Sequence, residues 1–356
     1  MNETRMRNMD APLYDYAGAI HIHSNLSDGT GAVPMIIEQA RQAELDFIIL
    51  TDHEHLEARE LGYEGWRGNT LCLVGEEITP RFHNHYLAFN IRRPIRGRGN
   101  WRRPQAFIDE TRRQGGIGFI AHPIGDDYPV RGMAKPWLDW EVDGFTGIEL
   151  WSYMHDWARN LRWKNIARAL RDPDSLLRGP HPKALKRWDE IGKRRRVAAI
   201  GTLDIHAKRA PGLPCAKILP YRHAFRTIRT HVLTEYPLAQ NDPNEAGRQV
   251  YEALAHGRAY IAHDGFGDGA GFQFFAAKGG RTTALMGGET QMSAGLELYV
   301  KAPEKCSVTL LRDGEPIAQT NGKTLEAPAE KPGVYRIEAR KEGRPWIYSN
   351  AVYVRG

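Results

Sequence analysis

The sequence predicts an α/β region with mainly parallel strands, followed by a small all-β domain. Up to about residue 265, short apolar runs alternate with helical patterns. These runs contain few polar residues, as is typical of parallel strands buried on both faces. After about Phe266, apolar and polar residues alternate, and Asp-Gly, Asn-Gly and Pro-Gly turn signals separate the runs. A chain of 356 residues is also long enough for one large and one small domain. We therefore expect domains at 1–265 and 266–356.

The first region is predicted to contain repeated strand–helix units. The helix expected at residues 33–45 has apolar residues at helical spacing, and Pro34 suits its first turn. Pro104 opens a similar helix that two glycines end. Such units imply a parallel sheet, either open or closed into a barrel. The predicted strands are at residues 17–23, 46–53, 73–79, 85–90, 116–123, 145–151 and 197–206.

The second region is predicted to be an antiparallel β-sandwich of roughly 90 residues. None of the 14 histidines lies beyond His263, so this domain supplies no imidazole. Its predicted strands are at residues 272–277, 296–302, 307–314, 333–340 and 346–354.

Composition excludes several classes of protein. Three widely spaced cysteines argue against a disulfide framework and against a cysteine zinc site. No apolar stretch approaches the ~20 residues that span a bilayer, so no membrane partner is expected. The N-terminal residues lack the apolar core of a signal peptide, and a cytoplasmic location is expected.

The net charge of +6 and the pI near 9.1 suit an anionic partner. The excess is local: residues 159–196 hold thirteen Lys/Arg against four Asp/Glu, and residues 92–104 hold six arginines and no acid. These clusters are interpreted either as a solvated helix face and a charged loop, or as a collar around an anionic ligand.

Metal-competent side chains follow the apolar runs of several predicted strands. His21/His23, His83/His85 and Asp204/His206 are spaced by two, so each pair shares one face of a strand. The carboxyl ends of parallel strands meet at one edge, where α/β proteins build their sites. Imidazoles and carboxylates are ligands for zinc, manganese and iron. The other candidates at such positions are Asp28, His53, Glu77 and His122.

The stretches HIHSNLSDG, TDH, GEE, AHP and LDIH, in this order, resemble the motifs of the PHP (polymerase and histidinol phosphatase) superfamily. With the C-terminal β domain, the chain is similar to a carbaryl-hydrolase-like branch of these metallohydrolases. The resemblance implies a distorted seven-stranded β/α (TIM-like) barrel that holds two or three divalent ions, Zn, Mn or Fe. It further implies a first ligand set of His21, His23, Glu77 and Asp204, a second of Asp28, His53 and His206, and a third of Glu77, His85 and His122.

Some assignments stay open at this point. The family pattern favours Glu77 over Glu76, and the apolar run after His85 favours it over His83. Asp52 either bonds a ligand histidine or forms a turn, and Glu149 either enters the site or supports it. His263 and His55 are weaker candidates for the pocket. The remaining histidines are interpreted as surface or packing residues: His155, His181, His223, His231 and His256.

The leading hypothesis is a metal-dependent phosphoesterase in which a metal-activated hydroxide attacks a small phosphorylated, anionic substrate. Asp204 would belong to the catalytic centre, and His53 or His206 would assist the leaving oxygen. The alternatives are hydrolysis of an ester, carbamate or amide, a non-catalytic binding module, and a nucleic-acid-binding protein or nuclease. Arginines facing the metals would favour phosphate, whereas an aromatic wall built from Trp66, Trp101 or Trp137 would favour an aryl substrate.

Overall fold

The computed structural model describes residues 13–97, 103–129, 135–210 and 213–356. Trp101 and part of the 92–104 arginine cluster lie outside these ranges. The mixed α/β class is confirmed: the described residues form eight α-helices and two large sheets, plus the hairpin β10–β11. The helices are α1 (Val33–Gln42), α2 (Glu57–Glu60), α3 (Pro104–Arg113), α4 (Tyr153–Asn160), α5 (Ile166–Arg171), α6 (Pro182–Arg194), α7 (Tyr221–Ala224) and α8 (Pro243–Ala255). None of the helices in the described ranges has the length and apolar character that a membrane crossing requires.

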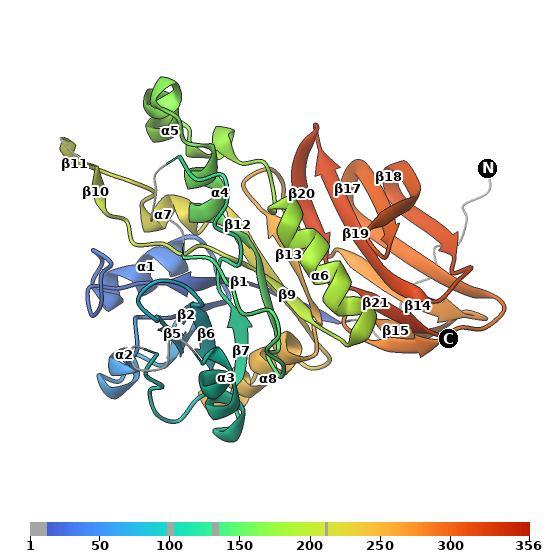
Figure 1. The fold of residues 1–356 in the computed structure, drawn as a ribbon, viewed down its shortest axis with the longest axis horizontal. Helices are drawn as coiled ribbons and strands as arrows, with labels where there is room; N and C mark the ends of the chain where they lie inside the picture. Colours follow the sequence, from blue (N-terminus) through green and yellow to red (C-terminus); the bar gives the residue numbers. More distant parts are fainter. Residues whose placement is uncertain (1–12, 98–102, 130–134, 211–212) are drawn as a thin grey trace.

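Strands β1 to β13 lie on the left and in the centre of the view in Figure 1. They are β1 (Tyr14–Ile22), β2 (Phe47–Leu50), β3 (Gly65–Arg67), β4 (Thr70–Val74), β5 (Glu76–Ile78), β6 (Tyr86–Phe89), β7 (Ile117–Ile120), β8 (Gly147–Ser152), β9 (Ala198–Thr202), β10 (Arg209–Ala210), β11 (Leu213–Lys217), β12 (Ile228–Thr234) and β13 (Ala259–His263). The orange and red strands lie on the other side (Figure 1). They are β14 (Gln273–Lys278), β15 (Arg281–Leu285), β16 (Glu289–Gln291), β17 (Leu296–Arg312), β18 (Glu315–Pro328), β19 (Gly333–Lys341), β20 (Arg344–Ser349) and β21 (Val352–Arg355).

The expected parallel order holds for only part of the first region. β1, β2 and β4 are parallel, as are β7, β8 and β9. However, β6 runs antiparallel to both β5 and β7. The physical reason is the short connection at residues 79–85, because a parallel crossover needs a dozen or more residues. β12 is also antiparallel, to β1 and to β13.

The two sheets meet along two lines. An isolated bridge joins His53 to Glu77, between the β2 and β5 strand ends. On the other side, the chain after β9 pairs with β1: Leu203 N–H donates to Ile20 O at 2.9 Å, and His23 N–H donates to Ile205 O at 3.1 Å. Inward-facing apolar side chains of both sheets form one buried cluster, which includes Ile20, Ile49, Leu73, Leu87, Phe119 and Ile200. The sheets therefore enclose a shared core.

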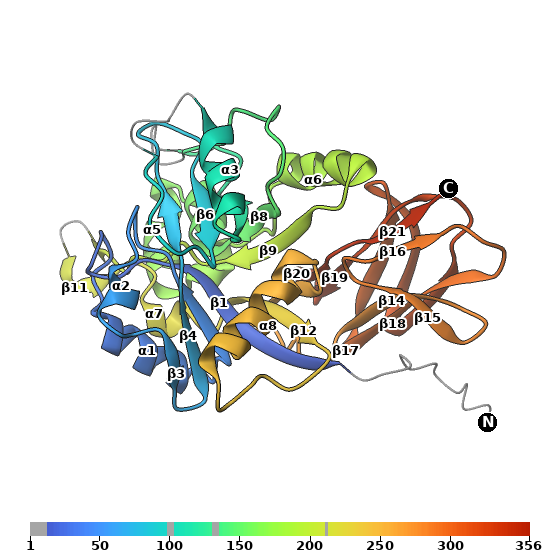
Figure 2. The ribbon, with the colours of Figure 1, turned by 90° about the horizontal axis from the view of Figure 1, so that it is seen from below.

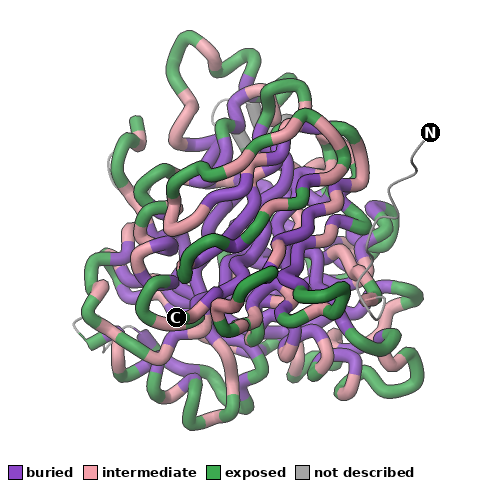
Figure 3. The backbone as a smooth tube through the Cα atoms, turned by 90° about the vertical axis from the view of Figure 1, so that its right-hand side faces the viewer, coloured by how far each residue is buried: buried purple, intermediate pink, exposed green. Residues whose placement is uncertain are grey.

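The C-terminal strands continue the larger sheet. β20 pairs antiparallel with β13, so the backbone hydrogen bonding passes from one side of the molecule to the other. β17 is longer than expected because the two runs predicted at 296–302 and 307–314 form one strand, which pairs with β18 and β19. Figure 2 shows α6 beside this junction, and Figure 3 shows the buried stretches gathered along the strands, with exposed stretches in the peripheral loops.

Candidate metal centre

All the predicted ligands lie at one edge of the strands. His21 is the last residue but one of β1 and His23 follows that strand, while His53, His122 and Asp204 follow β2, β7 and β9. His85 instead precedes its strand. Because β6 is antiparallel to its neighbours, its amino end lies at the edge where their carboxyl ends lie. The reversed strand therefore brings His85 to the same place.

Glu77, 2% exposed, lies at the centre of the cluster. Its Oε1 lies 2.9 Å from His85 Nδ1 and 3.0 Å from His122 Nε2. Its Oε2 lies 3.1 Å from His53 Nδ1 and 3.5 Å from Nε2 of both His21 and His23. Each carboxylate oxygen thus contacts a different group of imidazoles, which is the arrangement that a bridging carboxylate needs.

Asp204 has a similar position on the other side of the cluster. Its Oδ1 lies 3.4 Å from His21 Nε2 and 3.3 Å from His23 Nε2, and its Oδ2 lies 2.8 Å from His155 Nε2. Together, Glu77 and Asp204 flank the paired imidazoles of His21 and His23.

Asp28 gathers the remaining predicted ligands. Its Oδ1 lies 3.0 Å from His206 Nε2 and 3.2 Å from His53 Nε2, while Oδ2 pairs with Lys208 Nζ at 2.7 Å. In the described residues, potential ligand atoms fall into four groups, each within 4.8 Å. The groups are His23/Asp28/His53/His206, His21/His23/Asp204, Glu77/His85/His122 and His122/His155/Asp204.

The donor set fits divalent metal ions. His21 Nε2, both ring nitrogens of His23 and His53 Nδ1 are buried without a hydrogen-bond partner, although buried polar atoms are normally paired. Three of these nitrogens lie within 3.5 Å of carboxylate oxygens. Neutral imidazoles and carboxylates in tetrahedral or higher-coordinate sets are the ligands of zinc, manganese and iron. The residues therefore could hold such ions.

The electrostatics keep the carboxylates ionised. Burial by itself raises the pKa of Glu77 and Asp204, but His21 and the neighbouring imidazoles lower both pKa values well below the usual range. Burial likewise opposes protonation of His53, but the nearby carboxylates of Asp28 and Glu77 raise its pKa to about 10. His23 differs: burial and the nearby His206 lower its pKa to about 4. The carboxylates thus make this edge attractive to positive charge, which raises the pKa of His21 and His53 and would equally favour a bound cation.

Three of the predicted ligands have strained backbones. His21, His122 and Asp204 have φ of 67°, 27° and 49°. Residues other than glycine are uncommon in this region, which costs on the order of 1–3 kcal/mol each and persists at sites where the surroundings enforce it. At His21 the strain coincides with a register shift between Ile20 and Ile22. Simple strand alternation therefore does not describe the His21/His23 pair, although their rings converge with centroids 5.1 Å apart.

Two acidic residues near the centre, Glu149 and Asp52, have different partners. Glu149 Oε1 lies 3.1 Å from His21 Nδ1, and Oε2 accepts the His122 backbone N–H. Glu149 thus fixes the orientation of His21 from behind. Asp52 contacts the turn instead: it accepts the Ser24 N–H at 2.7 Å and the Ser24 hydroxyl at 2.8 Å.

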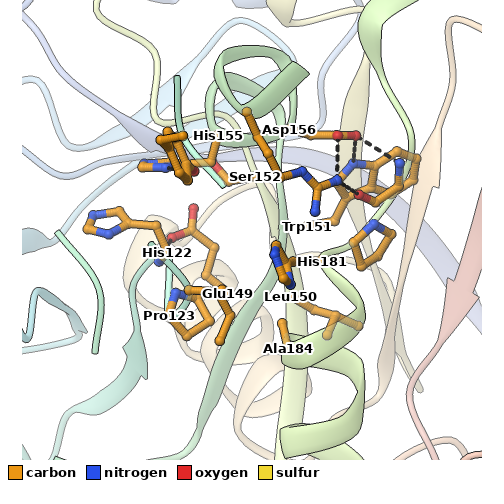
Figure 4. A pocket seen from close by; sticks show the side chains of 15 residues that line it. His122, Pro123, Glu149, Leu150, Trp151, Ser152, His155, Asp156, His181 and Ala184 are labelled. Atoms are coloured by element: carbon orange, nitrogen blue, oxygen red, sulfur yellow. Dashed lines mark hydrogen bonds and ion pairs between the residues drawn. The ribbon is translucent and has the colours of Figure 1, made fainter. Parts of the chain in front are cut away.

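One interpretation from the sequence was wrong. His155 was expected to be a surface or packing residue, but α4 carries it into the cluster, where it stacks on His122 with centroids 4.5 Å apart. Figure 4 shows the two imidazoles side by side, with Asp156 turned away towards Trp151. His155 Nδ1 also lies 2.5 Å from the Tyr128 hydroxyl. His155 was missed because it lies on a helix and not directly after an apolar run. Its place in GIELWSYMH, three residues beyond the end of β8, was the clue that it lies near the ligand edge.

Other candidates lie outside the metal groups found in the described residues. His83 belongs to no such group, and Glu76 turns away to accept the Ile95 N–H at 2.7 Å. His55 contacts Leu26 O, and His263 is stacked on Phe266. Trp66 bonds Ala239 O, and Trp137 packs against Tyr86 and Phe107, so neither forms the expected aromatic wall.

A cavity of about 760 Å³ opens onto the cluster. Its polar end contains Asp28, His53, Glu77, Asp204 and His206. The cations among its described lining residues are Lys135 and Lys208, and no arginine is present there. The arginine-rich segments therefore do not form the anticipated collar within the described part of this cavity.

Comparisons with known proteins gave structural similarities without sequence matches. No protein-family model matches the chain, and no curated protein matches it. A two-domain protein from Bacteroides vulgatus, containing a predicted PHP-like metal-dependent phosphoesterase, is 16% identical with a TM-score of 0.48, over 97% of this chain and 98% of that one.

Two further solved structures each cover a little over half of the chain. One, described as a metal-dependent phosphoesterase from Bifidobacterium adolescentis, is 18% identical with a TM-score of 0.36, over 56% of this chain and 92% of its own. The other, an amidohydrolase from Chromobacterium violaceum with bound sulfate and no metal, is 17% identical with a TM-score of 0.33, over 57% and 92%. At these values the similarities do not establish the family of this chain.

Proposed function

We propose that this protein is a metal-dependent hydrolase, and specifically a phosphoesterase acting on a small phosphorylated substrate. The observation that carries the proposal is the sharing of Glu77 and Asp204 between adjacent groups of imidazoles within a cavity. Ring nitrogens of His21, His23 and His53 that are buried without hydrogen-bond partners support it, because they are free to bind an ion.

The proposal includes two or three divalent ions, of Zn, Mn or Fe, held by the nine predicted ligands with His155 added. These are His21, His23, Asp28, His53, Glu77, His85, His122, Asp204 and His206. We also propose that the two adjoining sheets form the distorted seven-stranded barrel within residues 1–265, and that residues 266–356 form the β-sandwich.

When bound, such ions lower the pKa of a water towards neutrality and polarise the oxygen of the attacked group. The protein's own residues then have three tasks. Glu77 and Asp204 fix the spacing of the cluster, and Glu149 holds the His21 ring. Lys208 and Lys135, which line the cavity, attract the anionic group. His53 and His206, with side chains 30% and 13% exposed, line the cavity, and whichever of the two is not bound to an ion would give a proton to the leaving oxygen.

Hydrolysis of a carboxylic ester, carbamate or amide is the second candidate. The specific observation in its favour is the absence of arginine from the described cavity lining. The same cluster can polarise a carbonyl oxygen and so activate it for attack.

Metal content and activity together test the proposal. We expect the purified protein to bind two or three equivalents of metal, and Asp204→Ala to lose at least one equivalent and at least about 10²-fold in kcat/KM with phosphate monoesters. Asp109→Ala, on the exposed face of α3, is the matched control and should retain both. Elemental analysis, circular dichroism and phosphate release measure these effects. A metal-free protein, or turnover of a carbamate or amide with no phosphatase activity, would contradict the phosphoesterase assignment.

A further inference from the structure

The cavity at the metal cluster has two chemically different ends. The polar groups described above lie at one end, while the other is built from apolar side chains. That wall comes from α4, α5 and the segment before α7, and its larger members are Met154, Trp157, Leu161, Ile166, Leu170 and Leu219. We call these six residues the apolar wall.

The α5 helix is oriented with its apolar face towards this cavity. Ile166, Ala169 and Leu170 line the cavity, whereas Arg168 donates to Ser175 on another side of the helix, at 2.9 Å. The Trp157 indole N–H donates to Ala169 O at 3.3 Å, which fixes α5 against α4. The two helices of the apolar wall are therefore fixed against each other.

Parts of the apolar wall remain in contact with solvent. Ile166 is 48% exposed and Leu170 is 38% exposed, although a helix with one apolar face normally buries that face. Exposed apolar surface continuous with a cavity is typical of a ligand site, because water leaves such a surface favourably when a ligand covers it. Both side chains therefore keep apolar surface that a ligand could cover.

The volume also exceeds what a phosphate group needs. Ligand pockets of ~300–1,000 Å³ bury most of a drug-sized molecule, and this cavity falls in that range. With the hydrolysable group at the cluster, the remaining space is adjacent to the apolar wall. Hydroxyl-rich groups such as sugars would lose hydrogen bonds to water there without replacement.

We infer that the substrate of this centre carries a bulky apolar group, aryl or alkyl, which packs on the apolar wall while the bond to be cleaved lies at the cluster. The identity of the bond that is cleaved rests on the proposed function, whereas the apolar subsite does not. In a phosphate monoester, water would add to phosphorus as the P–O bond to the alcohol breaks. The leaving oxygen takes up a proton, and the products are inorganic phosphate and the apolar alcohol.

A series of alkyl phosphates isolates the contribution of apolar area, because ethyl, butyl and octyl phosphate have similar leaving groups. With manganese-loaded protein, we expect kcat/KM to rise from ethyl to octyl by on the order of 30-fold or more, since each buried methylene contributes roughly threefold and burial of about three of the six added methylenes gives this factor. Phenyl and 1-naphthyl phosphate form the aryl arm. A larger increase in that arm would identify an aryl substrate, and a larger increase in the alkyl arm an alkyl one.

Leu170→Asp and Ile166→Asp test the wall itself. Both side chains are partly exposed, so the variants should fold. We expect each variant to lose about tenfold or more in kcat/KM with octyl phosphate, and to change less than about twofold with ethyl phosphate. Leu61→Asp is the matched control, since Leu61 is 54% exposed and does not line the cavity. Equal kcat/KM along the alkyl series would overturn the inference while leaving the phosphoesterase proposal intact.

Binding provides a readout that needs no turnover. Calorimetry should show octylphosphonate binding at least about tenfold more tightly than ethylphosphonate, with the preference lost in Leu170→Asp. If this preference is seen but no phosphate ester is hydrolysed, the apolar subsite stands and the phosphoesterase proposal fails. If neither phosphonate binds and no ester is cleaved, both are overturned.

Discussion

At Glu77 and Asp204, the two oxygens of one carboxylate contact different groups of histidines. A buried glutamate does not by itself join the cluster: Glu76, one position away, is also buried, but its carboxylate accepts the Ile95 N–H. Successive residues of a strand point to opposite faces, so one glutamate of the pair faces the cluster. Strained backbones at His21, His122 and Asp204 complete the convergence.

His155 provides a test at the residue scale. Because its Nε2 lies 2.8 Å from Asp204 Oδ2 and its ring stacks on His122, His155→Asn should weaken Mn²⁺ binding by about 10–100-fold. His83→Asn is the matched control, since His83 belongs to none of the metal groups, and its Mn²⁺ affinity should change little. Calorimetric titration with Mn²⁺ measures both. Equal losses in the two variants would remove His155 from the centre.

The arrangement of the elements is set largely by connection lengths. Seven residues between β5 and β6 leave no room for a crossover helix, so β6 reverses and presents His85 at the edge shared by the other ligands. On the opposite side of the sheet, β1, β12 and β13 are connected by side chains as well as by backbone. His231 on β12 lies 2.9 Å from Asp15 on β1 and 3.3 Å from Asp264 after β13.

This network predicts a pH dependence of stability. Burial opposes the charge on His231, but hydrogen bonds to Asp15 and Asp264 raise its pKa to about 9, above the unfolded value of about 6.5. The stabilisation is therefore fully present below pH 6.5 and is lost as the pH rises towards 9, by at most about 3 kcal/mol. Urea unfolding at pH 6.5 and 9.5 measures the change. His256→Gln, at an exposed position, should keep it, whereas His231→Gln should reduce it; an unchanged pH dependence in His231→Gln would contradict this assignment.

At the scale of the whole molecule, buried polar contacts fasten the C-terminal strands to the first region. Asn350 accepts the Ala199 N–H at 2.7 Å and donates to Ala199 O and Ala259 O, so it links β9 and β13. Arg336 on β19 forms a two-point ion pair with Asp189 on α6, at 2.7 and 2.9 Å. With β13–β20 pairing, these contacts make the two regions one connected structure.

The Arg336–Asp189 pair predicts strong coupling between these regions. Arg336 and Asp189 are 2% and 5% exposed, so Arg336→Met should destabilise the protein by about 3–5 kcal/mol by leaving a buried carboxylate without its partner. The double variant Arg336→Met/Asp189→Leu should recover most of that loss, because the buried carboxylate at position 189 is removed. Glu338, which also pairs with Arg336 at 2.6 Å, is 23% exposed and keeps its contact with water. Denaturant unfolding of both variants measures the effect, and a double variant no more stable than Arg336→Met would argue against the charge as the cause.

Much of the fold could be predicted from the sequence. Helical spacing in residues 33–45 and 104–116 predicts α1 and α3, which begin at the expected residues Val33 and Pro104. Apolar runs predict the strands, because burial on both faces removes polar residues. Strand direction could not be read from those runs, since a buried strand looks the same in either orientation. The joining of two predicted runs into β17 was also missed, because the intervening residues carry a turn-like composition.

The sequence by itself predicted the nine candidate ligands, because most of them stand beside an apolar run and the motifs that complete the set are local in the sequence. Tertiary structure decided their partners. Whether Glu77 meets His85, whether α4 brings His155 to Asp204, and whether the cavity ends in an apolar wall depend on contacts between residues far apart in the chain. Local patterns specify which side chains become buried, whereas only the closed packing of the sheets and helices specifies which of them meet.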